Sequence, residues 1–371
     1  MNFIRRNAAI IVSLILFIVL IIIPTGFEGA VTYKNADKCA ALVLEVNNSN
    51  IIDTGLVRSG EQSCKVEILG GTFKGEVTDA YNPLSGSLEN DKIFEAGDKA
   101  MVLVSHDGTN ILSVSMVDHY RMNIEAILAA IFAIFLIIVA GRTGIRAVLS
   151  FVVTVLMLWK VLVPLYLKGY DPVICGLIVV TILTIIIISL VFGFDKRTAS
   201  AVCGSVAGLW VTAMLGIIFT SLLKIHGAVM PYSESLLYSG YQDLNLTSIF
   251  MASIFIGSSG AVMDLSVDIT SAVNEVVEKK PDITPWEAAK SGMNVGRAAM
   301  GTMTTTLLLA YSGGYIASLM VFMAQGTPIE NILNYKYVSA EILDTMVGSF
   351  GLVSVAPLTA LCSGFWLTKK K

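Results

Sequence analysis

The sequence is poor in charged residues and in the groups that usually bind metals or catalyse reactions. Asp, Glu, Lys and Arg make up 14% of its 371 residues, whereas about 25% is usual in soluble domains. So little charge cannot cover the surface of a soluble enzyme of this size, and that class is excluded. The three histidines are scattered and the five cysteines include no CxxC pair, so no metal framework is expected.

Two further absences narrow the function. The net charge is −3 and the isoelectric point is about 5.7, which excludes a nucleic-acid-binding protein. No phosphate-binding P-loop or other cofactor motif is present, so we expect no cofactor and no direct nucleotide drive. What remains is a polytopic membrane protein with one sizeable water-facing segment.

Long hydrophobic runs are abundant, and about eight of them can cross a bilayer, which needs about 20 mostly apolar residues. They cover residues 7–23, 123–141, 147–167, 172–194, 198–223, 246 to 269–277, 298–323 and 345–368. The second and third are the weakest, because the uncharged stretch 126–141 is short and Lys160 interrupts the third. A non-spanning hairpin is the alternative for this pair. Lys160 could also extend its ammonium group to the headgroups.

The distribution of Lys and Arg predicts the orientation. With the N-terminus inside, the short outer loops hold only Lys168, Lys224 and Lys336, and most other basic residues near the spans fall on the inner side. Such an excess is typical of the cytoplasmic face. We therefore expect a multi-pass protein of the plasma (inner) membrane with both termini in the cytoplasm. The first run could be a cleaved signal peptide, but no A-x-A site follows it, which favours an uncleaved anchor.

Residues 26–122 form the water-facing segment. Short alternating stretches at 41–46, 64–69, 73–80, 99–105 and 111–117 are separated by turn residues, which predicts a small extracytoplasmic β-domain, barrel or sandwich. Cys39 and Cys64 lie in it and could form a disulfide in an oxidising compartment; two unpaired thiols are the alternative. The predicted domains are thus an anchor at 1–25, the β-domain at 26–122, and a seven-helix membrane domain at 123–371 with a cytoplasmic elbow at 271–297.

Carboxyl groups in the sixth run are the strongest functional signal, because ionisable groups at bilayer depth are costly. Asp264 and Asp268 are four residues apart and share one helical face. If the span ends at residue 269, only Asp264 is submerged; if it continues to 277, Asp264 lies near the midplane. The glycines and serines at 257–260 would let a neighbouring helix approach closely.

The seventh run offers a polar surface that could face this carboxylate. It begins with Asn294 and Arg297 and continues through threonines that share a face, Thr302, Thr305 and Thr306. A carboxylate beside hydroxyl groups and an arginine could pass protons or bind a small cation. The alternatives are that the threonines bond to their own backbone and that Asp268 pairs with Arg297.

The residues present argue against two classes of intramembrane protease. The stretch Gly257-Ser258-Ser259-Gly260 resembles a rhomboid nucleophile motif, but no histidine lies at membrane depth to serve as the base. An aspartyl protease needs two carboxylates that face each other from different helices, whereas Asp264 and Asp268 lie on one. We therefore expect no enzymatic activity.

Several stretches resemble the YibE/F-like family of bacterial integral membrane proteins. They are 70–81 with Gly97-Asp98, Asp195 to Thr198, Gly260 to Asp264, and above all 291–311, which has the sequence SGMNVGRAAMGTMTTTLLLAY. The resemblance covers nearly all of the chain from about residue 60. It implies a multi-span bacterial membrane protein and no particular biochemical activity.

A more remote resemblance links 260–264, Glu275, Glu287-Ala288 and the threonine-rich run to the half-repeat of the RND superfamily and SecD/SecF. It implies proton coupling at Asp264, and a homo-oligomer or a paralogous partner that would complete the transporter. The chain departs from that pattern in its eight spans and small outer domain.

Two hypotheses follow from the sequence. In the first, the protein is an ion-coupled transporter or assists export, with the bilayer and a second membrane subunit as its partners. In the second, it is a non-transporting membrane scaffold whose outer β-domain binds a partner, and Asp264 only holds helices together.

Overall fold

The computed structural model describes residues 2–28 and 35–369. By their internal contacts these residues form two compact units, Met1–Phe27 with Leu136–Lys371, and Glu28–Phe135, and each is described by itself. Lys370 and Lys371, which contribute to the predicted inner charge, lie outside the described residues.

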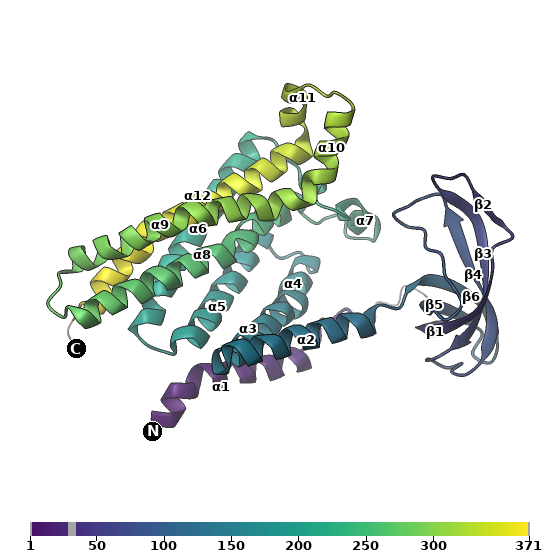
Figure 1. Ribbon diagram of the computed structural model, residues 1–371, viewed down its shortest axis with the longest axis horizontal. Coiled ribbons are helices and arrows are strands. Elements are labelled where there is room, and N and C mark those ends of the chain that lie inside the picture. Colours follow the sequence, from purple (N-terminus) through teal and green to yellow (C-terminus); the bar gives the residue numbers. More distant parts are fainter. Residues whose placement is uncertain (1, 29–34, 370–371) are drawn as a thin grey trace. The chain divides into compact units, whose positions relative to one another are not determined.

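The first unit is helical (Figure 1). Its helices and helical turns are α1 (Asn2–Ile22), α3 (Arg142–Met157), η1 (Leu158–Leu162), α4 (Val163–Leu167), α5 (Pro172–Phe192), α6 (Lys196–Leu222), η2 (Gly227–Val229), α7 (Ser233–Tyr238), α8 (Leu246–Lys279), α9 (Pro285–Ser312), η3 (Gly313–Tyr315), α10 (Ile316–Ala324), α11 (Ile329–Asn334) and α12 (Lys336–Leu367). Helix α2 (Met122–Ala140) begins in the second unit and ends in the first.

Seven helical segments of the described chain are long and apolar enough to cross a membrane, and α1 adds a shorter apolar helix over Ala8–Ile22. The predicted polytopic helical architecture is confirmed, and α1 covers the first predicted run almost completely. The second and third runs form long apolar helices, Met122–Ala140 and Arg142–Leu167. Lys160 lies in the π-helical turn η1, and its Nζ is 3.4 Å from the carbonyl oxygen of Ile23, just past the end of α1. The ammonium group thus faces the partial negative charge at a helix C-terminus.

The connection between α8 and α9 differs from the predicted elbow. Helix α8 continues to Lys279 and α9 already begins at Pro285, so residues 280–284 replace the elbow expected at 271–297. A capping box starts α9, with the hydroxyl of Thr284 accepting from the amide of Glu287. Instead of ending at the interface, the helix continues to Ser312, because no proline follows Pro285 until Pro328.

The second unit contains a β-barrel built from strands β1 (Ala36–Asn47), β2 (Ile51–Asp53), β3 (Arg58–Ile68), β4 (Val77–Ser85), β5 (Lys99–His106) and β6 (Ile111–His119). The strand order is β1-β5-β6-β4-β3-β2, and β1 also pairs with β3, which closes the sheet. All pairings are antiparallel except β4 with β6. This connectivity, a five-stranded Greek-key barrel with β2 added at one edge, is that of the OB fold. The predicted barrel alternative is therefore confirmed.

The structure does not support the predicted disulfide. Cys39 and Cys64 are both free and buried, and both point into the barrel core. Strand register separates them, because Cys64 pairs with Val46, seven positions along β1 from Cys39. A disulfide needs Cα atoms within about 7 Å, whereas seven strand residues span about 23 Å. Burial raises the pKa of the Cys64 thiol to about 11, as expected for a packed, unreactive side chain.

Three helices form the centre of the first unit. Ser266 of α8 donates a hydrogen bond of 2.7 Å to the carbonyl oxygen of Ala201 in α6, and its hydroxyl is 3.0 Å from that of Thr359 in α12. One turn further along α8, Thr270 and Ser363 lie 3.0 Å apart. These buried hydroxyl groups join α6, α8 and α12 where water cannot compete for them.

Glycine makes this close approach possible. A Cβ atom at Gly204 of α6 would lie 2.7 Å from the Cα atom of Thr359, which no side chain adjustment can relieve. At the same crossing, the sulfur atoms of Cys203 and Cys362 are 3.6 Å apart. The helices α6 and α12 are therefore in backbone contact, as small residues permit in membrane bundles.

We predict that Gly204→Ala destabilises the protein while Gly301→Ala does not. Overpacking a tight contact costs about 1–3 kcal/mol, whereas a Cβ atom at Gly301 in α9 would meet no atom within 4 Å. Both substitutions replace a helical glycine by alanine and therefore raise the helix propensity equally. A difference between their melting temperatures thus reports the difference in packing. The measurement is the temperature at which half of the detergent-purified protein loses its monodisperse elution peak. Equal melting temperatures for the two variants would contradict the α6–α12 contact.

Candidate functional site

Helix α8 has two faces of different character. One packs into the bundle through Val262, Leu265 and Ile269, all fully buried. The other carries Asp264 and Asp268, and both are exposed on the surface of the bundle. The helical period therefore places the two carboxyl groups on one face, and they are close enough to interact electrostatically. At about 1.5 Å per residue, Asp264 lies about 27 Å from Leu246 and about 22 Å from Lys279, near the middle of α8.

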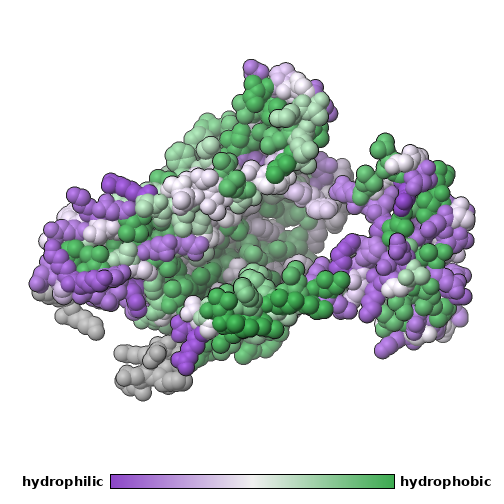
Figure 2. Space-filling view, viewed as in Figure 1, coloured by the Kyte–Doolittle hydropathy of each residue, from purple (hydrophilic) through white to green (hydrophobic). Residues whose placement is uncertain are grey.

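In the part of the chain that the structure describes, neither aspartate has a cationic partner. Among the described residues no Lys or Arg forms an ion pair with Asp264 or Asp268. Arg297 of α9 is exposed and makes no such pair, so the alternative of an Asp268–Arg297 pair has no support. Figure 2 shows that the helical surface is largely hydrophobic and that hydrophilic side chains gather where α8 meets α9. The two aspartates are thus acidic groups without a counter-charge on a membrane helix.

The threonines of α9 satisfy their hydroxyl groups locally. Thr302 donates to the carbonyl oxygen of Ala299 at 3.0 Å, Thr305 to Gly301 at 3.3 Å, and Thr306 to Thr302 at 3.0 Å. No hydrogen bond in the described chain joins them to Asp264. Asn294 is also exposed. The structure places α9 beside α8. The threonines predicted to face Asp264 instead donate to backbone carbonyl groups of α9, and Asn294 faces outward.

A second group of ionisable side chains was missed by the sequence analysis. Glu341 and Asp344 lie one turn apart on α12, and the phenols of Tyr311 and Tyr315 face them from the end of α9 and from η3. The Tyr311 hydroxyl and one oxygen of Asp344 are sealed from solvent and have no hydrogen-bond partner. We call these four residues the carboxyl–tyrosine cluster.

Sequence reasoning misses the cluster because the last apolar run begins only at residue 345. The helix begins nine residues earlier, at Lys336, so both acidic residues belong to it. The i, i+3 spacing of Glu341 and Asp344, directly before a long apolar run, is the sequence signal that could have revealed them. The tyrosines could not be assigned to the same site, since only the return of the chain through α10 and α11 brings α9 and α12 together.

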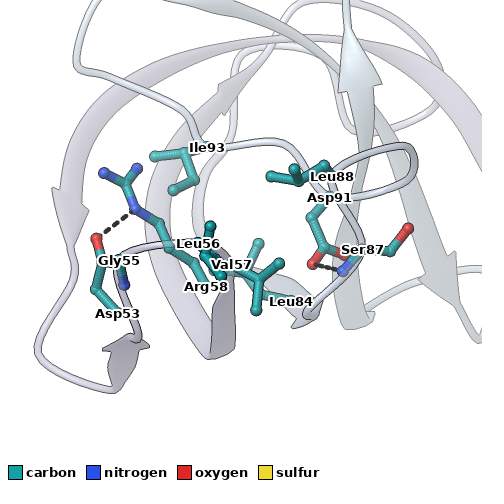
Figure 3. Close-up of a pocket in the computed structure, with 10 residues that line it drawn as sticks. All are labelled: Asp53, Gly55, Leu56, Val57, Arg58, Leu84, Ser87, Leu88, Asp91 and Ile93. Carbon is teal, nitrogen blue, oxygen red and sulfur yellow. Dashed lines mark hydrogen bonds and ion pairs between the residues drawn. The ribbon is translucent and has the colours of Figure 1, made fainter. Parts of the chain in front are cut away.

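The β-barrel has a pocket of its own, with a volume of about 390 Å³. Figure 3 shows apolar side chains, among them Leu56 and Leu84, between the Arg58–Asp53 pair on one side and a turn held by Asp91 on the other. Leu56 and Leu88 are 85% and 81% exposed, an unusual degree for leucine at a pocket rim. The lining of the pocket is thus a mixture of apolar side chains and of polar and charged groups.

The turn beside this pocket depends on one carboxylate. Asp91 accepts hydrogen bonds from the backbone amides of Ser85 at 2.9 Å, Gly86 at 2.7 Å and Ser87 at 2.9 Å. The amide of Ser85, together with those of Ser87 and Gly86, holds the pKa of Asp91 below its usual value. Donors that stabilise the charged form have this effect.

Long apolar helices, a bundle joined by buried hydroxyl groups, unpaired acidic side chains and a small β-barrel together define a polytopic membrane protein with an accessory β-domain. The YibE/F-like protein family matches residues 128–369, nearly two thirds of the chain. The chain belongs to this family. No curated protein matches it significantly, and no solved structure does. The remote similarity to the RND superfamily stays a prediction.

We predict that the turn at 85–91 loosens only in acid. Because the pKa of Asp91 is lower in the folded protein than in the unfolded chain, its stabilisation is complete above about pH 4 and is lost as pH falls through the folded pKa. Hydrogen exchange of the 85–87 amides in the full-length protein should therefore be unchanged from pH 7 to pH 5, relative to intrinsic rates, and faster near pH 3. Asp91→Asn should show the faster exchange already at pH 7. Asp79→Asn, at an exposed position on β4, is the control; equal protection in both variants would contradict the role of Asp91.

Proposed function

We propose that the protein is an ion-coupled transporter, or a subunit that assists export, of the bacterial plasma membrane, and that Asp264 carries the coupling proton. The observation that supports this is an acidic side chain near the middle of a membrane helix without a cationic partner. A charged carboxylate at the bilayer centre costs roughly 2.5–3.5 kcal/mol or more. Such a group is therefore expected to bind and release a proton rather than stay ionised.

The second acidic group on the same face, Asp268, supports a role for Asp264 in binding and releasing a proton, as opposed to a carboxyl group that stays protonated permanently. When Asp264 is ionised, Asp268 repels it, so a proton shared by the two is favoured. Asp268 lies one turn closer to Lys279 and the turn at 280–284, where hydrophilic residues gather. In this proposal it passes protons between Asp264 and the cytoplasm, with both termini on the cytoplasmic side.

The open surface around Asp264 fits a second membrane subunit. A Cβ atom at Gly260, one turn from Asp264, or at Gly301 would meet no atom within 4 Å. Helix α2 has no buried residue along its whole length. In our proposal, lipid covers α2, and a second copy or a paralogue covers the acidic face of α8 and encloses the carboxyl groups.

A partner-binding scaffold is the second candidate function, and the pocket of the β-barrel favours it. The exposed Leu56 and Leu88 offer an apolar contact, and the OB fold is often used for binding. In that function Asp264 would be dispensable as an acid.

The discriminating change is Asp264→Asn, which keeps the shape and hydrogen-bonding capacity but cannot ionise. We expect the variant to reach normal membrane levels and to complement a chromosomal deletion no better than an empty vector in competitive growth. Asp264→Glu should restore part of the function, because it restores an ionisable group.

Leu88→Asp is the matched test of the alternative. Transport predicts near-normal complementation by Leu88→Asp and none by Asp264→Asn. If Asp264→Asn complements the deletion and Leu88→Asp does not, with both proteins present at normal levels, the scaffold function is supported and the transporter function is contradicted.

A further inference from the structure

The carboxyl–tyrosine cluster lies where two distant parts of the chain meet. Glu341 and Asp344 are in the second and third turns of α12, and Tyr311 and Tyr315 are at the end of α9 and in η3. In Figure 1, α10 and α11 make the return that connects these two elements. Helix α8 contributes Gly257, where an added Cβ atom would lie 2.7 Å from the Tyr311 hydroxyl. The absence of a side chain there makes room for the phenol.

The cluster is partly enclosed, and its carboxyl groups are not paired with a cation in the part of the chain that the structure describes. The Tyr311 hydroxyl and an oxygen of Asp344 are inaccessible and unpartnered, while Tyr315 faces Glu341. Tyr337 is a further ionisable neighbour of Tyr315, and the ammonium group of Lys336 lies over the Tyr337 ring at 5.0 Å from its centroid. Within the described chain, no Lys or Arg forms an ion pair with Glu341 or Asp344.

Two carboxyl groups one helical turn apart in such surroundings are expected to hold a proton between them. Mutual repulsion and the loss of hydration both favour the uncharged form of one member. A phenol that has no other partner can donate to the member that stays ionised. The Tyr311 hydroxyl and the free Asp344 oxygen are therefore the donor and acceptor that a protonation change would use.

We propose that Glu341 and Asp344, assisted by Tyr311 and Tyr315, form a second proton-binding site of this protein. Gly257, which contacts Tyr311, lies seven residues before Asp264 on α8, about 10 Å along the helix axis. The site is thus separate from Asp264 but reaches the same helix. A role of this cluster in proton transfer rests on the proposed transport function. Its ability to bind a proton does not depend on that function.

The test is infrared spectroscopy of the full-length protein in lipid nanodiscs. At pH 7 ordinary Asp and Glu residues are ionised, so absorption by protonated carboxyl groups reports only abnormal ones. We expect the double variant Glu341→Gln/Asp344→Asn to lose the absorption of one carboxyl group relative to the wild type. Asp264→Asn should retain this component. A double variant with an unchanged protonated-carboxyl band would overturn the proposal.

Two further measurements keep the test decisive if the double variant folds poorly. Tyr311→Phe removes only the hydroxyl group and should raise the pH at which the band disappears, because the ionised form loses a donor; an unchanged midpoint would count against the site. Loss of the band on adding sodium chloride, but not choline chloride, would assign the site to sodium instead of protons. The growth assay of Asp264→Asn is independent, so a failure of the coupling proposal and a failure of this one are distinguishable.

Discussion

Acidic side chains without cationic partners, held on membrane helices, are the constraint on which the functional interpretation depends. The bilayer supplies neither water nor counter-ions, so each such group must be neutralised by a proton, by a neighbouring subunit or by its own helix surroundings. The chain places four of them on two adjacent helices, Asp264 and Asp268 on α8 and Glu341 and Asp344 on α12. The central bundle joins the same two helices through Ser266 and Thr359.

The bundle combines a tight centre with a more open side. Helices α6, α8 and α12 approach to backbone contact and bury their hydroxyl groups against one another, while α9 leaves most of its polar residues exposed. Helix α8 belongs to both regions, since one face lies in the centre and the other carries Asp264. In the proposed transporter, α8, whose other face packs in the centre of the bundle, would hold the carboxyl group while neighbouring parts move against it.

The β-barrel contributes a different kind of surface. It closes through the double pairing of β1, and its core is sealed by apolar side chains and by the amide of Gln62, which bonds to both the carbonyl oxygen and the amide of Phe94. This bonding fixes the 86–98 connection, beside which the pocket lies. Membership of the YibE/F-like family covers the helices from residue 128 onward, so the barrel has to be understood from its own structure.

The sequence by itself determined the features that depend on local periodicity and composition. Apolar runs of sufficient length predicted the membrane helices, alternation and turns predicted most strands, and the four-residue interval placed Asp264 and Asp268 on one face. Features that depend on contacts between distant segments were decided only by the tertiary structure. Strand register keeps Cys39 from Cys64, the return through α10 and α11 brings Tyr311 to Asp344, and helix crossing brings Cys203 to Cys362. Spacing along the chain fixes which face a residue occupies, but only packing of the whole bundle fixes what that face meets.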